Sequence, residues 1–174
     1  TGLTIKKFET ELIKKFGGKY CTVVNNGTSA LFVAGKALGW KKGDRILTTP
    51  LSFLATANCI VNNNAIPDFV DIETKTFTID PNRIEDKVKK KRIKAVIAVD
   101  YAGHPCDWRS LKYLARKHNF VLINDACHAM GSKYNGSSKY STKYADFVTQ
   151  SYHPVKAVTT GEGGSIFCKN KNIS

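Results

Sequence analysis

Lys156 is the first candidate for a reactive side chain. It follows Ser151 by five residues, at the exit of an apolar run, and it precedes the glycine-rich segment 161–164. A lysine held near a hydroxyl and a glycine-rich turn can act as a nucleophile that forms imines with carbonyl compounds. The alternative is a solvated charge, because lysine and arginine together account for 27 residues. Only its surroundings can distinguish Lys156 from the other lysines.

A small polar turn is a candidate phosphate site. An apolar strand at 21–24 is followed by Gly27, Thr28 and Ser29, and a helix is predicted from residue 30. Strand, turn and helix in this order point backbone N–H groups and a helix dipole at a phosphate. The GxxxxGK[ST] pattern of a P-loop is absent, and Asn-Gly also makes ordinary turns.

Four other residues could contact a small aromatic or charged ligand. Asp125 follows an apolar strand, and His128 comes three residues later. Phe53 lies shortly after Pro50, and Ser151 ends the strand predicted at 147–151, which opens with the apolar pair Phe147 and Val148. Each has an ordinary alternative: Phe53 could be core, Asp125 a helix cap, His128 a buried hydrogen-bonded histidine, and Ser151 a partner of its own backbone.

Short apolar runs alternate with helical patterns along the whole chain. Strands are predicted at 21–24, 45–48, 66–72, 95–99, 120–123, 147–151 and 165–168. Helices are predicted at 4–16 with Thr4 as N-cap, and at 30–38, 53–61, 82–88 and 108–118. This alternation predicts an α/β fold with a mostly parallel sheet. Because ligands bind beyond the carboxyl ends of such strands, all the candidate residues are expected at one rim.

Taken together, the candidate residues match the needs of pyridoxal phosphate. A phosphate takes N–H and hydroxyl donors, and the pyridine ring takes a flat side chain on its face. The ring nitrogen takes a carboxylate that keeps it protonated, so that the ring can act as an electron sink. The aldehyde takes a lysine, first as an imine and then as a proton shuttle. The joint order of these residues favours the functional interpretation over the separate ordinary ones.

Composition limits the classes of partner. The net charge of +13 can mark a nucleic-acid or membrane partner, but the lysines are scattered, and the one dense run, 87–94, is explained by a solvated helix end. No apolar run reaches membrane-spanning length. We therefore expect neither nucleic acid nor a membrane as partner, although a basic nucleic-acid-binding module remains an alternative that rests on charge alone. The five cysteines form no CxxC pair, so we expect no metal site, and a reducing cytoplasm fits.

Five blocks of sequence resemble a known enzyme family. They are NNGTSAL, TTPLSFLATAN, VDYAGHPCD, INDACHAMGSKYNG and SYHPVKAVTTGEGG. Their types and order are similar to the nucleotide-sugar aminotransferases, the DegT/DnrJ/StrS group of fold-type-I pyridoxal-phosphate enzymes. The second and fifth blocks look closest to the branch that aminates the C4 ketone of a UDP-linked 4-keto-6-deoxy-N-acetylhexosamine, in the pseudaminic-acid route. The resemblance implies a three-layer sandwich, the large domain of fold-type-I transferases.

The resemblance also implies a role for each candidate residue. Lys156 would form the internal aldimine, Asp125 would pair with the pyridine nitrogen, and His128 would lie near the 3-hydroxyl of the ring. Phe53 would stack on the ring. The phosphate would be held by the remaining candidates, Gly27, Thr28, Ser29 and Ser151. A deoxygenating branch has histidine in place of the lysine, so Lys156 favours amino transfer.

The implied reaction moves an amino group, with L-glutamate as donor, to the keto carbon of a nucleotide-linked keto-deoxy sugar. Members of the family are longer and form their active sites between two subunits, so the resemblance implies a homodimer. It also implies that residues 1–174 are a large-domain fragment without the smaller C-terminal domain. A catalytically incompetent fragment, which keeps the fold as a binding or interaction piece, is the alternative from another functional class.

Overall fold

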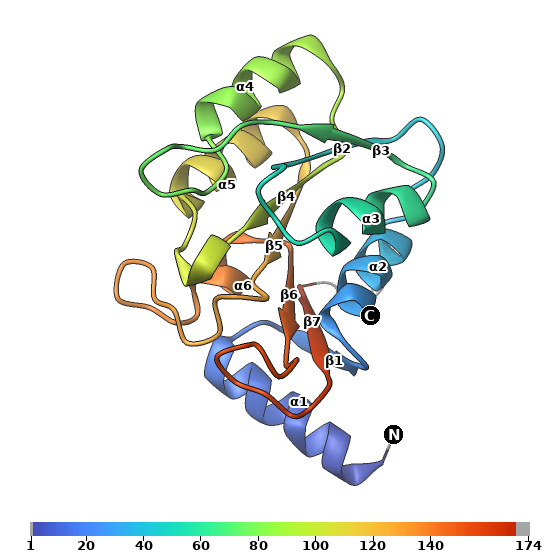
Figure 1. Cartoon of the computed structure of the whole chain (residues 1–174), viewed down its shortest axis with the longest axis vertical. Helices are drawn as coiled ribbons and strands as arrows, with labels where there is room; N and C mark the ends of the chain where they lie inside the picture. Colours follow the sequence, from blue (N-terminus) through green and yellow to red (C-terminus); the bar gives the residue numbers. More distant parts are fainter. Residues whose placement is uncertain (1, 170–174) are drawn as a thin grey trace.

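The central sheet has seven strands within residues 2–169, which are the residues that this computed structural model describes (Figure 1). The strands are β1 (Tyr20–Val24), β2 (Arg45–Thr48), β3 (Ile66–Phe69), β4 (Ala95–Val99), β5 (Val121–Asp125), β6 (Phe147–Ser151) and β7 (Gly164–Cys168). Their order is β1-β7-β6-β5-β4-β2-β3. Strands β2 to β6 pair in parallel, whereas β7 runs antiparallel to both β6 and β1. The predicted α/β fold with a mostly parallel sheet is therefore confirmed.

Helices cover both faces of the sheet, which gives three layers (Figure 1). They are α1 (Leu3–Phe16), α2 (Gly27–Ala37), α3 (Ala55–Asn62), α4 (Pro81–Lys90), α5 (Trp108–His118) and α6 (Tyr140–Tyr144), with a 3-10 turn at Tyr101–Gly103. One hydrophobic core joins the sheet to α1, α4, α5 and α6. A second core joins it to α2 and α3. Buried apolar side chains thus lie on both faces of the sheet, as an α/β sandwich requires.

Several predicted helix boundaries were wrong. Helix α1 begins at Leu3 with Gly2 in the N-cap position and no side-chain cap, so Thr4 is not its N-cap. Helix α2 begins at Gly27 because Asn26 caps it, whereas residue 30 was predicted. Helix α3 begins at Ala55, so Phe53 belongs to the turn before it. Of these three starts, only that of α2 is set by a capping side chain, and helix ends in general vary by one or two residues in ways that a hydrophobic pattern does not register.

Two strand ends differ from the prediction by more than one residue. Strand β3 ends at Phe69 rather than at Ile72, which forms only an isolated bridge with Ile79. Strand β5 continues through Asn124 to Asp125, two residues further than predicted. Asp125 pairs in register with Val99 on β4 and with Thr149 on β6. The carboxylate is therefore held by the sheet itself and not by a loop.

Strand register brings distant segments together at the carboxyl rim of the sheet. Gly164 on β7 pairs with both Val24 on β1 and Ser151 on β6. A Cβ atom at Gly164 would lie 2.5 Å from the backbone carbon of Asn26. A Cβ atom at Gly27 would lie 2.8 Å from Ser151 Cβ. Glycine at these two positions lets the start of α2 pack directly on the end of β6.

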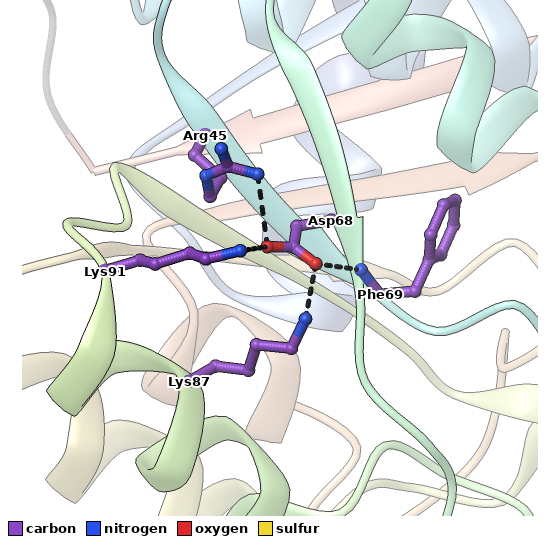
Figure 2. Close-up of polar contacts among 5 residues, drawn as sticks. All are labelled: Arg45, Asp68, Phe69, Lys87 and Lys91. Carbon is purple, nitrogen blue, oxygen red and sulfur yellow. Dashed lines mark hydrogen bonds and ion pairs between the residues drawn. The ribbon is translucent and has the colours of Figure 1, made fainter.

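The basic run at 87–94 is only partly a solvated helix end. Lys87 Nζ lies 2.6 Å from Asp68 Oδ1, while Lys91 Nζ and Arg45 lie 3.6 and 3.3 Å from Asp68 Oδ2 (Figure 2). Partial burial opposes ionisation of Asp68, but the Lys87 hydrogen bond and the neighbouring cations lower its pKa overall. These pairs connect the end of α4 to the edge strand β3. Such half-exposed pairs each stabilise the fold only slightly.

Candidate active site

One cavity of about 460 Å³ collects most of the predicted site residues at the carboxyl rim. Of the predicted residues, its lining contains Gly27, Thr28, Phe53, Asp125, His128, Ser151 and Lys156. They come from the start of α2, from the turn after β2, from the end of β5 and the turn that follows it, and from the end of β6 and the loop beyond it. Ser29 is the predicted residue that the lining does not include. The convergence on one rim is the arrangement that the alternating pattern predicts.

The loop between β6 and β7 holds the half-buried Lys156. Its base is closed by the Tyr152 N–H, which donates to the Gly163 carbonyl at 2.9 Å. Thr159 Oγ1 donates to the Tyr152 carbonyl at 2.8 Å, and the Lys156 N–H donates to the His153 carbonyl at 2.9 Å. The lysine therefore sits on a hydrogen-bonded loop anchored in two paired strands, and its side chain lines the cavity.

Asp125 supplies a buried carboxylate, with only 4% of the residue exposed. Oδ2 accepts a hydrogen bond from Thr56 Oγ1 at 2.7 Å, and Oδ1 accepts one from the Cys127 N–H at 3.2 Å. Among the described residues no lysine or arginine forms an ion pair with it. A buried carboxylate normally has a cationic partner. The protonated nitrogen of a pyridine ring would supply that charge, so the site fits pyridoxal phosphate.

The start of α2 fits a phosphate group. Asn26 Oδ1 accepts the Ser29 N–H at 2.8 Å, so the cap already satisfies that amide. The Gly27 and Thr28 N–H groups have no acceptor within the described chain, and both residues line the cavity. Helix N-termini with unsatisfied amides bind anions. A phosphate role for Ser29 stays a prediction, and its amide is engaged elsewhere.

His128 and Cys127 lie beside the lysine. Burial lowers the pKa of His128, the Lys156 charge lowers it further, and Asp125 opposes both effects. The imidazole is therefore neutral at neutral pH and can donate one hydrogen bond and accept another. Burial, with the nearby Asp125, raises the pKa of Cys127 well above its usual value, so this side chain is a neutral thiol. Phe53 is 69% exposed at the edge of the cavity, where a flat ligand can reach its ring.

Sequence reasoning missed several lining residues, namely Asn26, Ser52, Thr56, Cys127, His153 and Glu162. His153 Nε2 and Glu162 Oε1 lie 3.8 Å apart, at the two ends of the lysine loop. Ser52 lies in the turn before α3 and Thr56 in the first turn of that helix. Their contact depends on the geometry of this turn, which a hydrophobic pattern does not register.

A larger cavity of about 570 Å³ lies away from these residues, between the start of α4 and the start of α5. Its carboxylates are already engaged locally: Asp80 accepts the Asn82 N–H at 2.8 Å, and Asp107 accepts Ser110 Oγ at 2.6 Å. None of the predicted site residues lines it. We therefore assign the chemistry to the smaller cavity.

No helix within residues 2–169 is long and apolar enough to cross a membrane. In the same part of the chain, no group of three or more His, Cys, Asp or Glu side chains is arranged to hold a metal ion.

Comparison with known proteins agrees with this geometry. The chain is 38% identical over 172 residues to the GDP-perosamine synthase of Escherichia coli O157:H7, covering 99% of this chain and 46% of that protein. It is 40% identical over 174 residues to a UDP-4-amino-4,6-dideoxy-N-acetyl-beta-L-altrosamine transaminase of Campylobacter jejuni. This match covers 99% of this chain and 45% of that protein. The chain thus spans just under half the length of these curated relatives.

Solved structures show the same fold. Helicobacter pylori PseC, an aminotransferase involved in the biosynthesis of pseudoaminic acid, superposes with a TM-score of 0.91 at 32% identity, over 99% of this chain and 46% of that one. Bacillus subtilis NtdA, solved with bound cofactor PMP, superposes with a TM-score of 0.90 at 30% identity. This match covers 99% of this chain and 38% of that one. These neighbours confirm the fold-type-I architecture that the resemblance implied. The sequence matches the DegT/DnrJ/EryC1/StrS aminotransferase family over residues 1–174, and the chain belongs to that family.

Proposed function

We propose that the chain is the cofactor-binding large domain of a pyridoxal-phosphate-dependent aminotransferase. It moves an amino group from L-glutamate to the keto carbon of a nucleotide-linked keto-deoxy sugar. The observation that carries this proposal is the convergence of Lys156, Asp125 and His128 on one cavity whose rim also holds an anion-binding helix start. The sugar-nucleotide transaminases among its relatives support the substrate class. The domain is proposed to span 1–174, of which residues 1 and 170–174 lie outside the described part.

Pyridoxal phosphate, when bound, supplies an aldehyde that takes up the amino group and a ring that withdraws electrons from the reacting carbon. Lys156 Nζ would hold the aldehyde carbon and, once released, carry a proton between cofactor and substrate. Asp125 would accept the N–H of the ring nitrogen and keep it protonated. The Gly27 and Thr28 amides and Ser151 Oγ would bind the phosphate, and Phe53 would exclude water from the ring.

The quaternary structure and the cellular location of the enzyme are proposed from the same family relationship. We propose that two subunits complete each site, because Phe53, Leu54 and Val155, at or beside the cavity, are 69%, 66% and 78% exposed, and apolar surface of this extent normally meets a partner. Cys21, Cys59, Cys106 and Cys127 are free thiols, which fits a reducing cytoplasm.

The proposal is tested by trapping the cofactor. Protein mixed with pyridoxal phosphate is reduced with borohydride, digested and mapped by mass spectrometry. We expect a single reduced cofactor adduct on Lys156, with a matching visible absorption band before reduction. Label spread over many surface lysines, without that band, would show that the chain holds the fold but not the chemistry, which is the incompetent-fragment alternative.

Asp125→Asn tests the role of the carboxylate. The change keeps the shape of the side chain but removes the charge that would hold the ring nitrogen protonated. We expect the rate of amino transfer to fall about 10³-fold, the scale of losing one preorganised charge contact in a closed site. The measurement is the spectral change when L-glutamate is added to cofactor-loaded protein.

Asp146→Asn is the matched control for this prediction. Asp146 accepts hydrogen bonds from Lys112 Nζ and the Leu122 N–H, away from the cavity. Its replacement is expected to leave the rate within about threefold, since substitutions away from a site change free energies by only a few tenths of a kcal/mol. Equal rates for the two variants would contradict the assignment of Asp125.

A further inference from the structure

Two hydroxyl groups connect the turn after β2 to the buried carboxylate. Thr56 Oγ1 lies 2.7 Å from Asp125 Oδ2, and Ser52 Oγ lies 2.6 Å from Thr56 Oγ1. Thr56 is 1% exposed, so water does not compete for its hydroxyl. Ser52 also lines the cavity, so the chain of hydroxyls runs from the cavity wall to Asp125.

The direction of these hydrogen bonds follows from proton counting. An ionised carboxylate can only accept, so Thr56 must give its one hydroxyl proton to Asp125. The remaining lone pairs of Thr56 Oγ1 then accept, and Ser52 is the donor in the second contact. Two hydroxyl dipoles therefore point in series toward Asp125, and each strengthens the other.

We propose that Thr56 is a positioning residue for the cofactor ring, which it orients by fixing the orientation of the Asp125 carboxylate. This inference rests on the proposed function. One Asp125 oxygen is occupied by Thr56 and the other by the Cys127 N–H, which fixes the carboxylate plane. The remaining lone pairs are then presented in one orientation to the N–H of a pyridine ring. Thr56 itself touches neither the ring nor the substrate in this role.

The position of Thr56 in the chain explains why the residue is suited to this task. The Thr56 N–H donates to the Phe53 carbonyl at 3.1 Å, so Phe53, Ser52 and Thr56 belong to one closed turn. The five residues 52–56 therefore place both Phe53, the proposed ring-stacking residue, and Thr56, which orients Asp125. A shift of this turn would move both contacts together.

Binding measurements test the proposal. Thr56→Val removes the hydroxyl with little change of shape, and Thr56→Ser keeps it. We expect Thr56→Val to bind pyridoxal phosphate about 10- to 100-fold more weakly, the range for a hydrogen bond to a charged group. Thr56→Ser should bind nearly as the wild type does. An analogue with CH in place of the ring nitrogen should bind both proteins equally, because it offers Asp125 no N–H.

Thr48→Val is the matched control. Thr48 is equally buried, and its Oγ1 donates to the Ile97 carbonyl at 3.1 Å, one strand away from the site. This variant should lose stability to a similar degree without losing cofactor affinity. If Thr56→Val and Thr48→Val bind pyridoxal phosphate equally well, Thr56 has only a structural role and the proposal is wrong.

A measurement without cofactor separates this proposal from the proposed function. A double-mutant cycle by urea unfolding of the cofactor-free proteins combines Thr56→Val with Asp125→Ala, which remove the two partners of one hydrogen bond. The double variant should therefore lose less free energy of unfolding than the sum of the two single variants. Thr48→Val, which shares no hydrogen bond with Asp125, should be additive with Asp125→Ala. Wild-type protein that binds no pyridoxal phosphate would refute the proposed function. Coupling between Thr56 and Asp125 would then still support Thr56 as the group that holds Asp125, and additivity would overturn it.

Discussion

Replacing Lys156 with alanine is expected to lower the rate of amino transfer by about 10⁵-fold or more, because one residue would act both as nucleophile and as proton carrier. The loop that carries it is anchored by Tyr152 and Thr159 and not by the lysine side chain. The variant should therefore fold normally and still bind the phosphate end of the cofactor. The measurement is the half-reaction with L-glutamate, followed spectroscopically in wild type and variant.

Lys133→Ala provides the control for this result. Lys133 is exposed, follows His128 by five residues and does not line the cavity. Its removal should change neither the rate nor the position of the borohydride adduct. A Lys156→Ala protein that transfers amino groups within tenfold of the wild-type rate would show that another amine performs the chemistry.

The second large effect concerns a buried carboxylate outside the cavity. Asp100 is fully buried at the end of β4. Oδ1 accepts the Cys106 N–H at 2.9 Å and Trp108 Nε1 at 3.1 Å. Oδ2 accepts Tyr140 OH at 2.6 Å and Asn124 Nδ2 at 3.0 Å. One side chain thus connects β4, β5, α5 and α6 beneath the rim.

Asp100→Ala is expected to lower the free energy of unfolding by about 4–5 kcal/mol, because it leaves four buried donors without an acceptor and opens a cavity. That is a large share of the stability of an ordinary domain. Urea unfolding followed by circular dichroism measures the change. Asp44→Ala, which breaks a partly buried pair with Lys94 near the surface, should lower it by less than about 1 kcal/mol. Similar losses for the two variants would contradict the network.

The same carboxylate makes the free energy of unfolding depend on pH. Burial, which outweighs the hydrogen bonds from Tyr140 and Cys106, raises the pKa of Asp100 from 3.8 to about 6. Between these two values the folded state holds the proton more tightly than the unfolded state does. The contribution of Asp100 to stability is therefore fully present below about pH 4 and falls by about 3 kcal/mol as the pH rises to 6.

Asp100→Asn isolates this contribution, because the amide does not titrate. We expect the free energy of unfolding of the wild type, minus that of the variant, to decrease between pH 4 and pH 6 and to stay level above. A difference that stays constant or increases over this window would show that burial does not dominate at Asp100.

Much of the site could be predicted from the sequence because the hydrophobic pattern shows where the parallel strands end. Short, fully apolar runs such as Ala95–Val99 and 120–123 mark buried strands, and polar residues just after such strands must meet at one rim. Asp125, Ser151 and Lys156 were placed there by this rule and line one cavity. Local patterns suffice for these residues because the sheet brings them together.

The start of α2 shows where local patterns mislead. The helix was predicted to begin at residue 30, after the small polar turn, but Asn26 caps it and it begins at Gly27. At the first helical position glycine costs little, so Gly27 does not prevent this start. The cap takes the Ser29 N–H, so that amide is already engaged, and a phosphate role for Ser29 stays a prediction.

The sequence by itself determined the alternation of strands and helices, the parallel core of the sheet and the residue types at its rim. The tertiary structure alone decided which side chains from other elements support these residues. Thr56 and Asp125 are 69 residues apart, and Tyr140 and Asp100 are 40 apart. Lys87 and Asp68 belong to different elements. No periodicity relates such pairs, because their contact depends on how separate elements pack and not on the order of residues within one.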